Sequence, residues 1–514
     1  MAVNNNKIAK NTFFLYIRMM LTMVISIYTS RIILEILGET DFGIYNVVGG
    51  FVSMFTMVSG ALSAATQRFL SYELGKGEHG RVNEVFSTSI MMHILIAFII
   101  LVLAETVGLW FVNEKMIFPE ARYNAANWVY QLSLMTFLVD IVSVPYNAAL
   151  VAYERMKAFA YVSIIEVVLK LVVVYMLLIS PIDRLVFYAS LLSLISILIR
   201  VLYGYYVKRN LAKCRCNYVI NKEIGKQMVS FMGWNMFGAG AIVANGQGVN
   251  VLLNLFFGAA VNAARGIVFQ VQGAIRGFVT NFQLAMSPQI IKSYASNDTD
   301  EMFSLVFNGA RFSFLLMMNL ALPIILKAPF ILDLWLVHVP SYTVIFLRIV
   351  LVTTLIESLG TTLSYAMHAS GKVRNYQIVV GSLSLLALPI IYEFLRFGCP
   401  PFVAFFVVLF FAIISLLAQV VMLHLSINLP ILMFLKNVFA RSVFVFVASI
   451  PVPVIIDSFF KKGDCFSFIV VTLVCVGSSF VCSLYLGLSS LERGLLFEKI
   501  SNLMNKMCHK RLIF

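Results

Sequence analysis

Long apolar stretches separated by short polar connections make up nearly the whole chain. Fourteen such stretches can be delimited, and most of them exceed the roughly 20 residues that a membrane-spanning helix needs. The longest connection between two of them is about 20 residues, which leaves no room for a soluble domain. The predicted spans are residues 12–37, 42–74, 85–112, 123–150, 158–180, 185–207, 227–257, 262–290, 302–327, 343–370, 375–396, 401–425, 436–457 and 466–489.

A polar stripe interrupts the apolar pattern of the eighth predicted span, 262–290. Arg265 and Arg276 are eleven residues apart, which places them within about 20° of each other on a helix, and Gln272 and Gln283 lie on the same line. A charge at the bilayer centre costs on the order of 3 kcal/mol or more. We therefore expect the stripe to face a wet cavity. Burial against other helices is the alternative, but this span holds no acidic partner for the guanidinium groups.

The first span repeats this arrangement. Arg18, Thr22, Ser26 and Thr29 fall within about 80° of arc, and we expect this face to be turned toward the same cavity.

The seventh span, 227–257, is rich in glycines and amides. Asn250 and Asn254 share one face with Gln247. Glycines at this density permit a helix to bend. Close helix packing through small residues explains them equally well, and both interpretations stay open.

Acidic and imidazole groups are few inside the spans. Asp140 lies in the middle of the fourth span, and Glu357 shares a face with His368 in the tenth. Glu166 and Lys170 are spaced i,i+4 in the favourable order, so we interpret them as a structural ion pair.

Composition and charge agree with a polytopic membrane protein. Of the 514 residues, 61% are hydrophobic and 12% are charged, about half the charged fraction of a soluble protein. Twenty-two basic residues fall in the connections of one side and seven in those of the other. The positive-inside rule then places both termini in the cytoplasm. The net charge of +14 reflects that cytoplasmic face and not nucleic-acid binding.

Motifs of catalysis and metal binding are not found in the sequence. It contains no nucleophile elbow, zinc-protease helix, P-loop or dinucleotide fingerprint, so we expect no enzyme and no cofactor. Cys214 and Cys216 lie in a basic loop without a further ligand nearby, and we predict no metal site there.

The segments repeat at an offset of 220 residues. LEILG at 34–38 then aligns with NLFFG at 254–258, and AATQRFLSY at 64–72 aligns with LAMSPQIIK at 284–292. Both copies begin on the same side, which indicates parallel repeats about an axis along the membrane normal. We predict an all-α protein of about 14 transmembrane helices, built as two pseudo-symmetric six-helix bundles, two additional C-terminal helices and a cytoplasmic tail: 1–210, 211–430, 431–490 and 491–514.

The stretch SRIILEILGETDFGIYNVVGGFVSMF resembles the start of bacterial polysaccharide flippases. These Wzx-type O-antigen flippases belong to the polysaccharide transporter family, within the multidrug/oligosaccharidyl-lipid/polysaccharide (MOP) exporter superfamily. The resemblance rests on a pattern of the form LG-x-x-x-(F/Y)-G-(I/L)-Y, which in this chain is made by Leu37, Gly38, Phe42, Gly43, Ile44 and Tyr45.

The resemblance implies a transporter of the bacterial inner membrane, multi-pass, that flips a lipid-linked oligosaccharide of the undecaprenyl-diphosphate type by alternating access. Membrane lipids, and a polysaccharide polymerase or other assembly proteins, are the expected partners. Planar arginine side chains suit a diphosphate and acidic sugars. The candidate substrate-binding residues of the cationic cavity are Arg18, Arg265, Gln272, Arg276, Arg311, Asn250 and Asn254.

Two alternatives remain at the level of the sequence. A cation-coupled multidrug exporter of the related extrusion family would need acidic groups for a cationic drug, whereas basic residues outnumber acidic ones in these spans. A polymerase, ligase or scaffold of the same pathway is the other alternative. For an ion-coupled cycle, the candidate coupling residues are Asp140, Glu357 and His368.

Overall fold

The computed structural model is helical, with no strand among the residues it describes. The described residues are 5–53, 56–114, 116, 119–180, 183–215, 221–336, 339–460, 465–488 and 493–494. Apart from its residues 493–494, the predicted cytoplasmic tail 491–514 lies outside them.

The first part of the chain forms the helices of the first six predicted spans. They are α1 (Asn5–Ser53), α2 (Thr56–Gly75), α3 (Val82–Leu103), α4 (Leu109–Glu114), α5 (Tyr123–Ala152), α6 (Met156–Met176) and α7 (Arg184–Asn210).

The remaining helices follow in the order of the other eight predicted spans. They are α8 (Lys222–Phe257), α9 (Ala259–Ala295), α10 (Thr299–Leu326), α11 (Ala328–Trp335), α12 (Thr343–Ser370), α13 (Val373–Arg396), α14 (Val403–Ile427), α15 (Ile431–Phe434), α16 (Arg441–Ser449), α17 (Pro451–Ser458) and α18 (Cys465–Cys482). The short helix α11 lies in a connection that the apolar pattern treated as a loop.

The prediction of an all-α, multi-pass membrane protein is confirmed. Eleven helical segments in the described part of the chain are long and apolar enough to cross a membrane. The described residues of the three other predicted spans are helical as well: 12–37 lies in α1, 42–74 is divided between α1 and α2, and 262–290 lies in α9.

Two compact units make up the fold. Unit 1 comprises Met1–Val243, Leu284–Met302 and Tyr365–Gly381, and unit 2 comprises Ala244–Gln283, Phe303–Ser364 and Ser382–Phe514. Five helices, α8, α9, α10, α12 and α13, each pass from one unit to the other. The division into bundles at 1–210, 211–430 and 431–490, which was drawn on the sequence repeat, stays a prediction.

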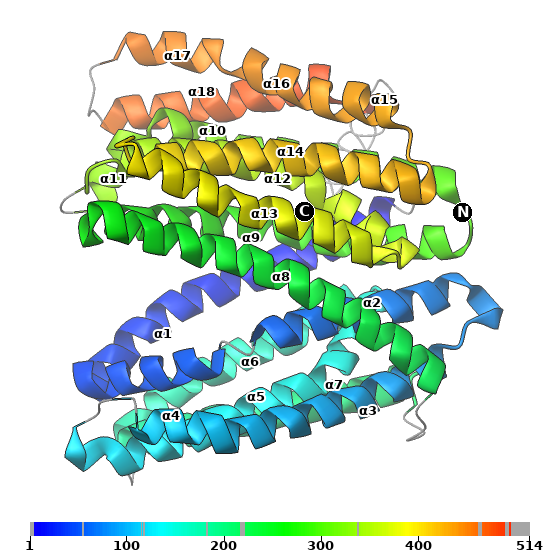
Figure 1. Cartoon of the computed structure of the whole chain (residues 1–514), viewed down its shortest axis with the longest axis vertical. Coiled ribbons are helices and arrows are strands. Elements are labelled where there is room, and N and C mark those ends of the chain that lie inside the picture. The colour runs from blue at the N-terminus through cyan, green and yellow to red at the C-terminus, as the bar shows by residue number, and fades with distance from the viewer. Residues whose placement is uncertain are drawn as a thin grey trace, which may run out of the picture. The chain divides into compact units, whose positions relative to one another are not determined.

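Helix α5 is the centre of unit 1. It packs against α1, α2, α3, α6 and α7, and Figure 1 shows α3, α5 and α7 side by side. Its side chains Tyr130, Leu134 and Ile141 are fully buried. Because lipid is as apolar as these side chains, α5 is held by close packing and by hydrogen bonds such as that from Tyr130 Oη to the Ala104 carbonyl at 2.8 Å.

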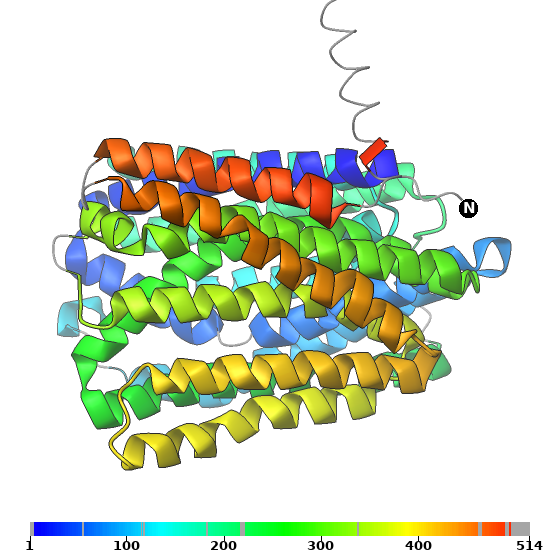
Figure 2. The same cartoon turned by 90° about the horizontal axis from the view of Figure 1, so that it is seen from above.

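Helices α12 and α10 are the most enclosed of the candidate spans. Of the residues in their most apolar stretches, 67% and 61% are buried inside the protein. Helix α18 runs along α16 and α17 (Figure 2). Buried Lys327, just before α11, forms an ion pair with Asp457 and donates to Ser467 Oγ at 2.8 Å. This contact fixes α17 and α18 to the start of α11.

Two glycines at the ends of the first and seventh spans adopt the same unusual backbone conformation. Gly38 has a φ of 74° and Gly258 a φ of 78°, a region that favours glycine because it has no side chain. They are 220 residues apart, which is the offset of the sequence repeat. The two copies therefore turn at equivalent positions.

Candidate functional site

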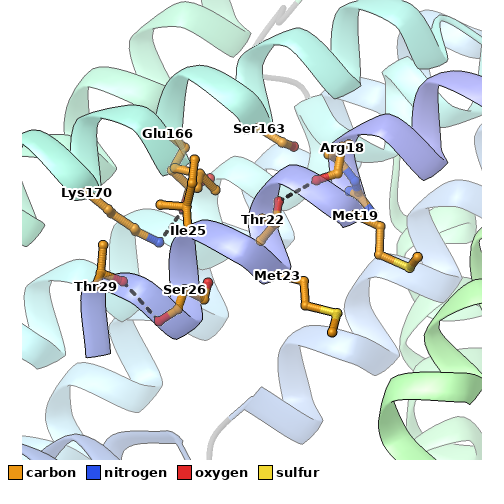
Figure 3. Close-up of a pocket in the computed structure, with 11 residues that line it drawn as sticks. Arg18, Met19, Thr22, Met23, Ile25, Ser26, Thr29, Ser163, Glu166 and Lys170 are labelled. Carbon is orange, nitrogen blue, oxygen red and sulfur yellow. Dashed lines mark hydrogen bonds and ion pairs between the residues drawn. The ribbon is translucent and has the colours of Figure 1, made fainter. Parts of the chain in front are cut away.

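A cavity of about 460 Å³ lies between α1 and α6 within unit 1 (Figure 3). Helix α1 supplies seven lining residues and α6 supplies four. The lining residues are Arg18, Met19, Thr22, Met23, Ile25, Ser26, Thr29, Ser163, Glu166, Val167 and Lys170.

The polar face of α1 forms one wall of this cavity. Arg18, Thr22, Ser26 and Thr29, grouped by their helical spacing in the sequence, all line it. Thr22 Oγ1 donates to the Arg18 carbonyl at 2.7 Å, and Thr29 Oγ1 donates to the Ser26 carbonyl at 3.1 Å. These bonds return the donors of the two threonines to their own helix, while the hydroxyl oxygens can still accept from a ligand.

Basic charge exceeds acidic charge on the cavity wall. Figure 3 shows Arg18 toward one end of the cavity and Lys170 toward the other. Arg18 is half-buried and its guanidinium lies 4.8 Å from the centre of the Phe159 ring. Lys170 Nζ donates to Glu166 Oε1 at 2.6 Å, and Glu166 is the one acidic residue among the described lining residues. The cavity is therefore suited to an anionic group.

The predicted ion pair between Glu166 and Lys170 forms, but the sequence did not indicate that it lines the cavity. The i,i+4 spacing indicated an ion pair, whereas nothing in the sequence indicated that α6 faces the polar stripe of α1. The packing of α1 against α6 brings the pair to the cavity wall.

The polar stripe of α9 packs against α12 in unit 2. Gln272 Nε2 donates to Thr354 Oγ1 at 2.8 Å, and Gln283 Nε2 donates to the Ser358 carbonyl at 3.2 Å. Arg276 Nη1 lies 3.4 Å from Glu357 Oε2. The sequence offered no acidic partner within the span itself, and the structure supplies one from α12.

A small polar cavity of about 20 Å³ adjoins this ion pair, lined in part by Arg276, Glu357 and Thr361. A cavity of this size holds one water molecule. It is too small for a sugar or a diphosphate. The Arg276 and Glu357 side chains nevertheless remain 57% and 38% exposed, so the pair is not sealed inside the protein.

The other predicted cavity residues are not among the residues that line these two cavities. Arg265, expected on the same line as Arg276, donates through Nη2 to the Gly246 carbonyl of α8 at 2.7 Å and lies over the Phe269 ring. Arg311 is buried in α10 and donates to Asn308 Oδ1 at 2.9 Å. The residues that line neither cavity are Asn250, Asn254, Arg265, Gln272 and Arg311.

The three candidate coupling residues lie on two helices, α5 and α12, and make different contacts. Asp140 on α5 is exposed and accepts from Ser196 Oγ of α7 at 2.7 Å. Glu357 and His368 share α12, but eleven residues of helix separate them by about 16 Å along the axis. The His368 ring contacts Phe231 instead. Proton sharing between Glu357 and His368 therefore has no geometric support.

A metal site would need several ligand side chains close together in the described part of the chain. Within it, no group of three or more His, Cys, Asp or Glu residues could hold a metal ion. Burial raises the pKa of the Cys214 thiol to about 12, which disfavours the thiolate that a metal needs. Cys216 lies outside the described residues.

Comparisons with known proteins bear on the whole fold. A family model named MatE matches residues 15–176. A MATE protein in its straight conformation shares 12% identity at a TM-score of 0.72, covering 84% of this chain and 96% of that one. The chain has the fold of the MATE transporters.

Two further matches point in the same direction. One is a MOP superfamily transporter from Pyrococcus furiosus, for which a binding pocket of reverse polarity suggests a different function. Its identity is 11% and its TM-score 0.69, covering 83% of this chain and 96% of that one. The other is the uncharacterized membrane protein EpsK of Bacillus subtilis, 20% identical over 306 residues. That match covers 59% of this chain, which spans 60% of the length of EpsK. The solved structures therefore show the fold of this chain, and the family model matches part of its first half.

Proposed function

We propose that this protein flips a polyprenyl-diphosphate-linked oligosaccharide across the bacterial inner membrane by alternating access. The observation that carries the proposal is the cationic cavity between α1 and α6, where Arg18 and Lys170 face one carboxylate, Glu166. Its volume of about 460 Å³ lies within the range of small-molecule sites, about 300–1,000 Å³. A diphosphate and its first sugar suit a site of this size and charge.

The chemistry of the wall fits each part of such a head group. Arg18 offers two parallel N–H donors to phosphate oxygens, and Lys170 offers a point charge. The Thr22, Ser26 and Ser163 hydroxyls suit sugar hydroxyls, which both donate and accept hydrogen bonds. The polyprenyl tail would remain in the surrounding lipid. Membrane lipids and the assembly proteins of the same pathway are the proposed partners, with both termini in the cytoplasm.

A cation-coupled multidrug exporter is the second candidate. Asp140 favours it, because an exposed carboxylate on a membrane-spanning helix could bind a cation or a cationic drug. The MATE fold is compatible with both candidates. The sign of the cavity charge separates them: Arg18 and Lys170 would repel a cationic drug and attract an anionic head group.

A flipping assay in proteoliposomes tests the proposal. We expect Arg18→Ala to slow the flipping of a lipid-linked oligosaccharide by about tenfold to a hundredfold, since a hydrogen bond to a charged group contributes about 1.5–3 kcal/mol. Arg18→Lys should restore part of the rate, because it keeps the charge and loses the paired donors. Lys157→Ala is the matched control, since Lys157 lies on α6 and does not line the cavity.

Two results would count against the proposal. One is an Arg18→Ala variant that flips the lipid-linked sugar as fast as Lys157→Ala does. The other is efflux of a cationic dye by the wild-type protein under conditions in which it flips no lipid-linked sugar.

A further inference from the structure

Repeat-equivalent residues of α2 and α9 touch each other in unit 1. Gln67 Nε2 donates to Ser287 Oγ at 3.1 Å, and the two residues are 220 positions apart. A Cβ atom added to Gly75 would lie 2.6 Å from the Cβ of Ala295, again 220 positions away. Contact between equivalent residues is the mark of a self-complementary interface about a two-fold axis. The ends of α2 and α9 therefore meet at equivalent positions of the sequence repeat.

Gly75 is required at this point. An added methyl group would also lie 2.7 Å from the carbonyl oxygen and 2.9 Å from the Cα of Lys292, which are backbone atoms. The helices can approach this closely only because position 75 has no side chain.

A buried carboxylate reinforces the same contact. Glu154, in the turn between α5 and α6, accepts from Lys292 Nζ of α9 at 2.6 Å and from Gln289 Nε2 at 3.3 Å. Its side chain is 4% exposed, and its φ of 57° is rare for a residue other than glycine. Backbone strain of this kind persists where the surrounding structure holds it, and it is found at switching regions.

A third polar contact holds the end of α12. Arg68 of α2 donates through Nε to the His368 carbonyl at 3.0 Å and through Nη2 to the Ala369 carbonyl at 3.2 Å. These carbonyls belong to the last turn of α12, where a positive charge is favourable. Arg68 is itself buried, at 9% exposed.

We propose that these contacts form a latch, made of Arg68 and Gln67 of α2, Glu154, and Ser287 and Lys292 of α9, which releases the ends of α9 and α12 from α2 once in each transport cycle. The latch residues are polar, so water can replace their hydrogen bonds when they separate. Pro288 follows Ser287 directly and leaves α9 without one backbone hydrogen bond there, which permits bending. The positive-inside rule places this end on the cytoplasmic side, where water is at hand.

A thiol-accessibility experiment tests the latch without any transport substrate. Ser71 lies between Gln67 and Gly75 on one face of α2 and is 0% exposed, and its hydroxyl bonds to no group among the described residues. Ser71→Cys, in a protein whose other cysteines are replaced, is therefore a thiol probe that removes no hydrogen bond between described residues. With Gly75→Ala added, we expect a water-soluble maleimide to label it at least about tenfold faster.

The matched control is Gly60→Ala, also on α2, where an added methyl group meets no described atom within 4 Å. It should leave the labelling rate unchanged. Equal labelling in the two variants, with both monodisperse in detergent, would overturn the latch.

A cross-link provides a second test that does not depend on how Gly75→Ala folds. Gln67→Cys with Ser287→Cys places two thiols where the native side chains touch. Oxidation should stop transport, and reduction should restore it to at least half of the rate before oxidation. If transport continues at its full rate in the oxidised protein, the contact between Gln67 and Ser287 is permanent and does not open during transport. If the reduced protein flips no lipid-linked sugar but labelling still responds to Gly75→Ala, the proposed substrate fails and the latch stands.

Discussion

Three arginines within the spans have three different surroundings. Arg18 lines the α1–α6 cavity, Arg68 binds the end carbonyls of α12, and Arg276 faces Glu357. Helical spacing identified the polar face on which Arg18 and Arg276 lie. It did not show what each face meets, because Lys170, which lines the same cavity as Arg18, and Glu357, which pairs with Arg276, come from helices far away in the sequence.

The carboxylate in the cavity gives a prediction at the residue scale. Glu166 accepts from Lys170 at 2.6 Å, so an anion bound in the cavity has to compete with Glu166 for this donor. Glu166→Gln should therefore lower the concentration of lipid-linked sugar at half-maximal flipping by about threefold to tenfold, because a nearby negative charge is removed. The effect should shrink at high salt.

The matched control for this prediction is Glu114→Gln, which changes an exposed carboxylate at the end of α4. A cationic substrate would give the opposite sign, with weaker binding in Glu166→Gln. That result, or no difference from the control, would contradict an anionic ligand in the cavity.

Among the elements, the start of α7 depends on a charged cap. Asp183 accepts from the N–H groups of Leu185 and Val186 at 3.1 and 3.2 Å and also pairs with Arg122, which binds Asp41 as well. Burial by itself raises the pKa of Asp183. The hydrogen bonds and charge of Arg122, with the two backbone donors, outweigh burial and hold the pKa below its ordinary value.

A depressed carboxyl pKa stabilises the folded state above the pKa of the unfolded chain, and the stabilisation is lost as the pH falls through the folded-state pKa. Asp183→Ala should therefore lower stability at pH 7 by about 1 kcal/mol, the usual contribution of an N-cap. The difference from wild type should narrow below about pH 4. Thermal unfolding in detergent at several pH values measures this. A difference that stays constant down to pH 3 would show that the charge contributes nothing.

Helix boundaries show what local sequence could predict. The described residues of the fourteen apolar segments are largely helical, and the first of these segments ends at the turn of Gly38. The equivalent turn at Gly258 follows from the 220-residue offset. Helix α11 was not predicted, because its apolar residues do not differ in composition from a buried connection.

At the scale of the whole molecule, the sequence predicted the class of protein but not the contacts between helices that form the two cavities. Composition and span length are set by the lipid bilayer, which requires apolar side chains and a helical backbone along each span. The cavity and the latch depend instead on contacts between segments such as α1 with α6, or Glu154 with Lys292. No periodicity within one helix contains that information, so five of the seven predicted cavity residues line neither cavity.

Energy coupling is a property of the whole transport cycle. Its two candidate carboxylates, Asp140 and Glu357, differ in whether they form an ion pair. Glu357 faces Arg276, whereas no basic side chain among the described residues forms an ion pair with exposed Asp140. Protonation of Glu357 would sacrifice an ion pair, so Asp140 is the better candidate to bind and release a proton. Outward movement of an anionic head is also driven by an inside-negative potential, at about 2.3 kcal/mol per charge per 100 mV.

Proteoliposomes with the pH gradient and the potential imposed separately can resolve these contributions. We expect Asp140→Asn to abolish the response of flipping to a pH gradient and to leave its response to the potential unchanged. Glu357→Gln is the matched comparison and should keep both responses. If Asp140→Asn keeps its full response to the pH gradient, this carboxylate is not the coupling site. If wild-type flipping responds to the potential alone, the charge of the head group drives the cycle without an ion.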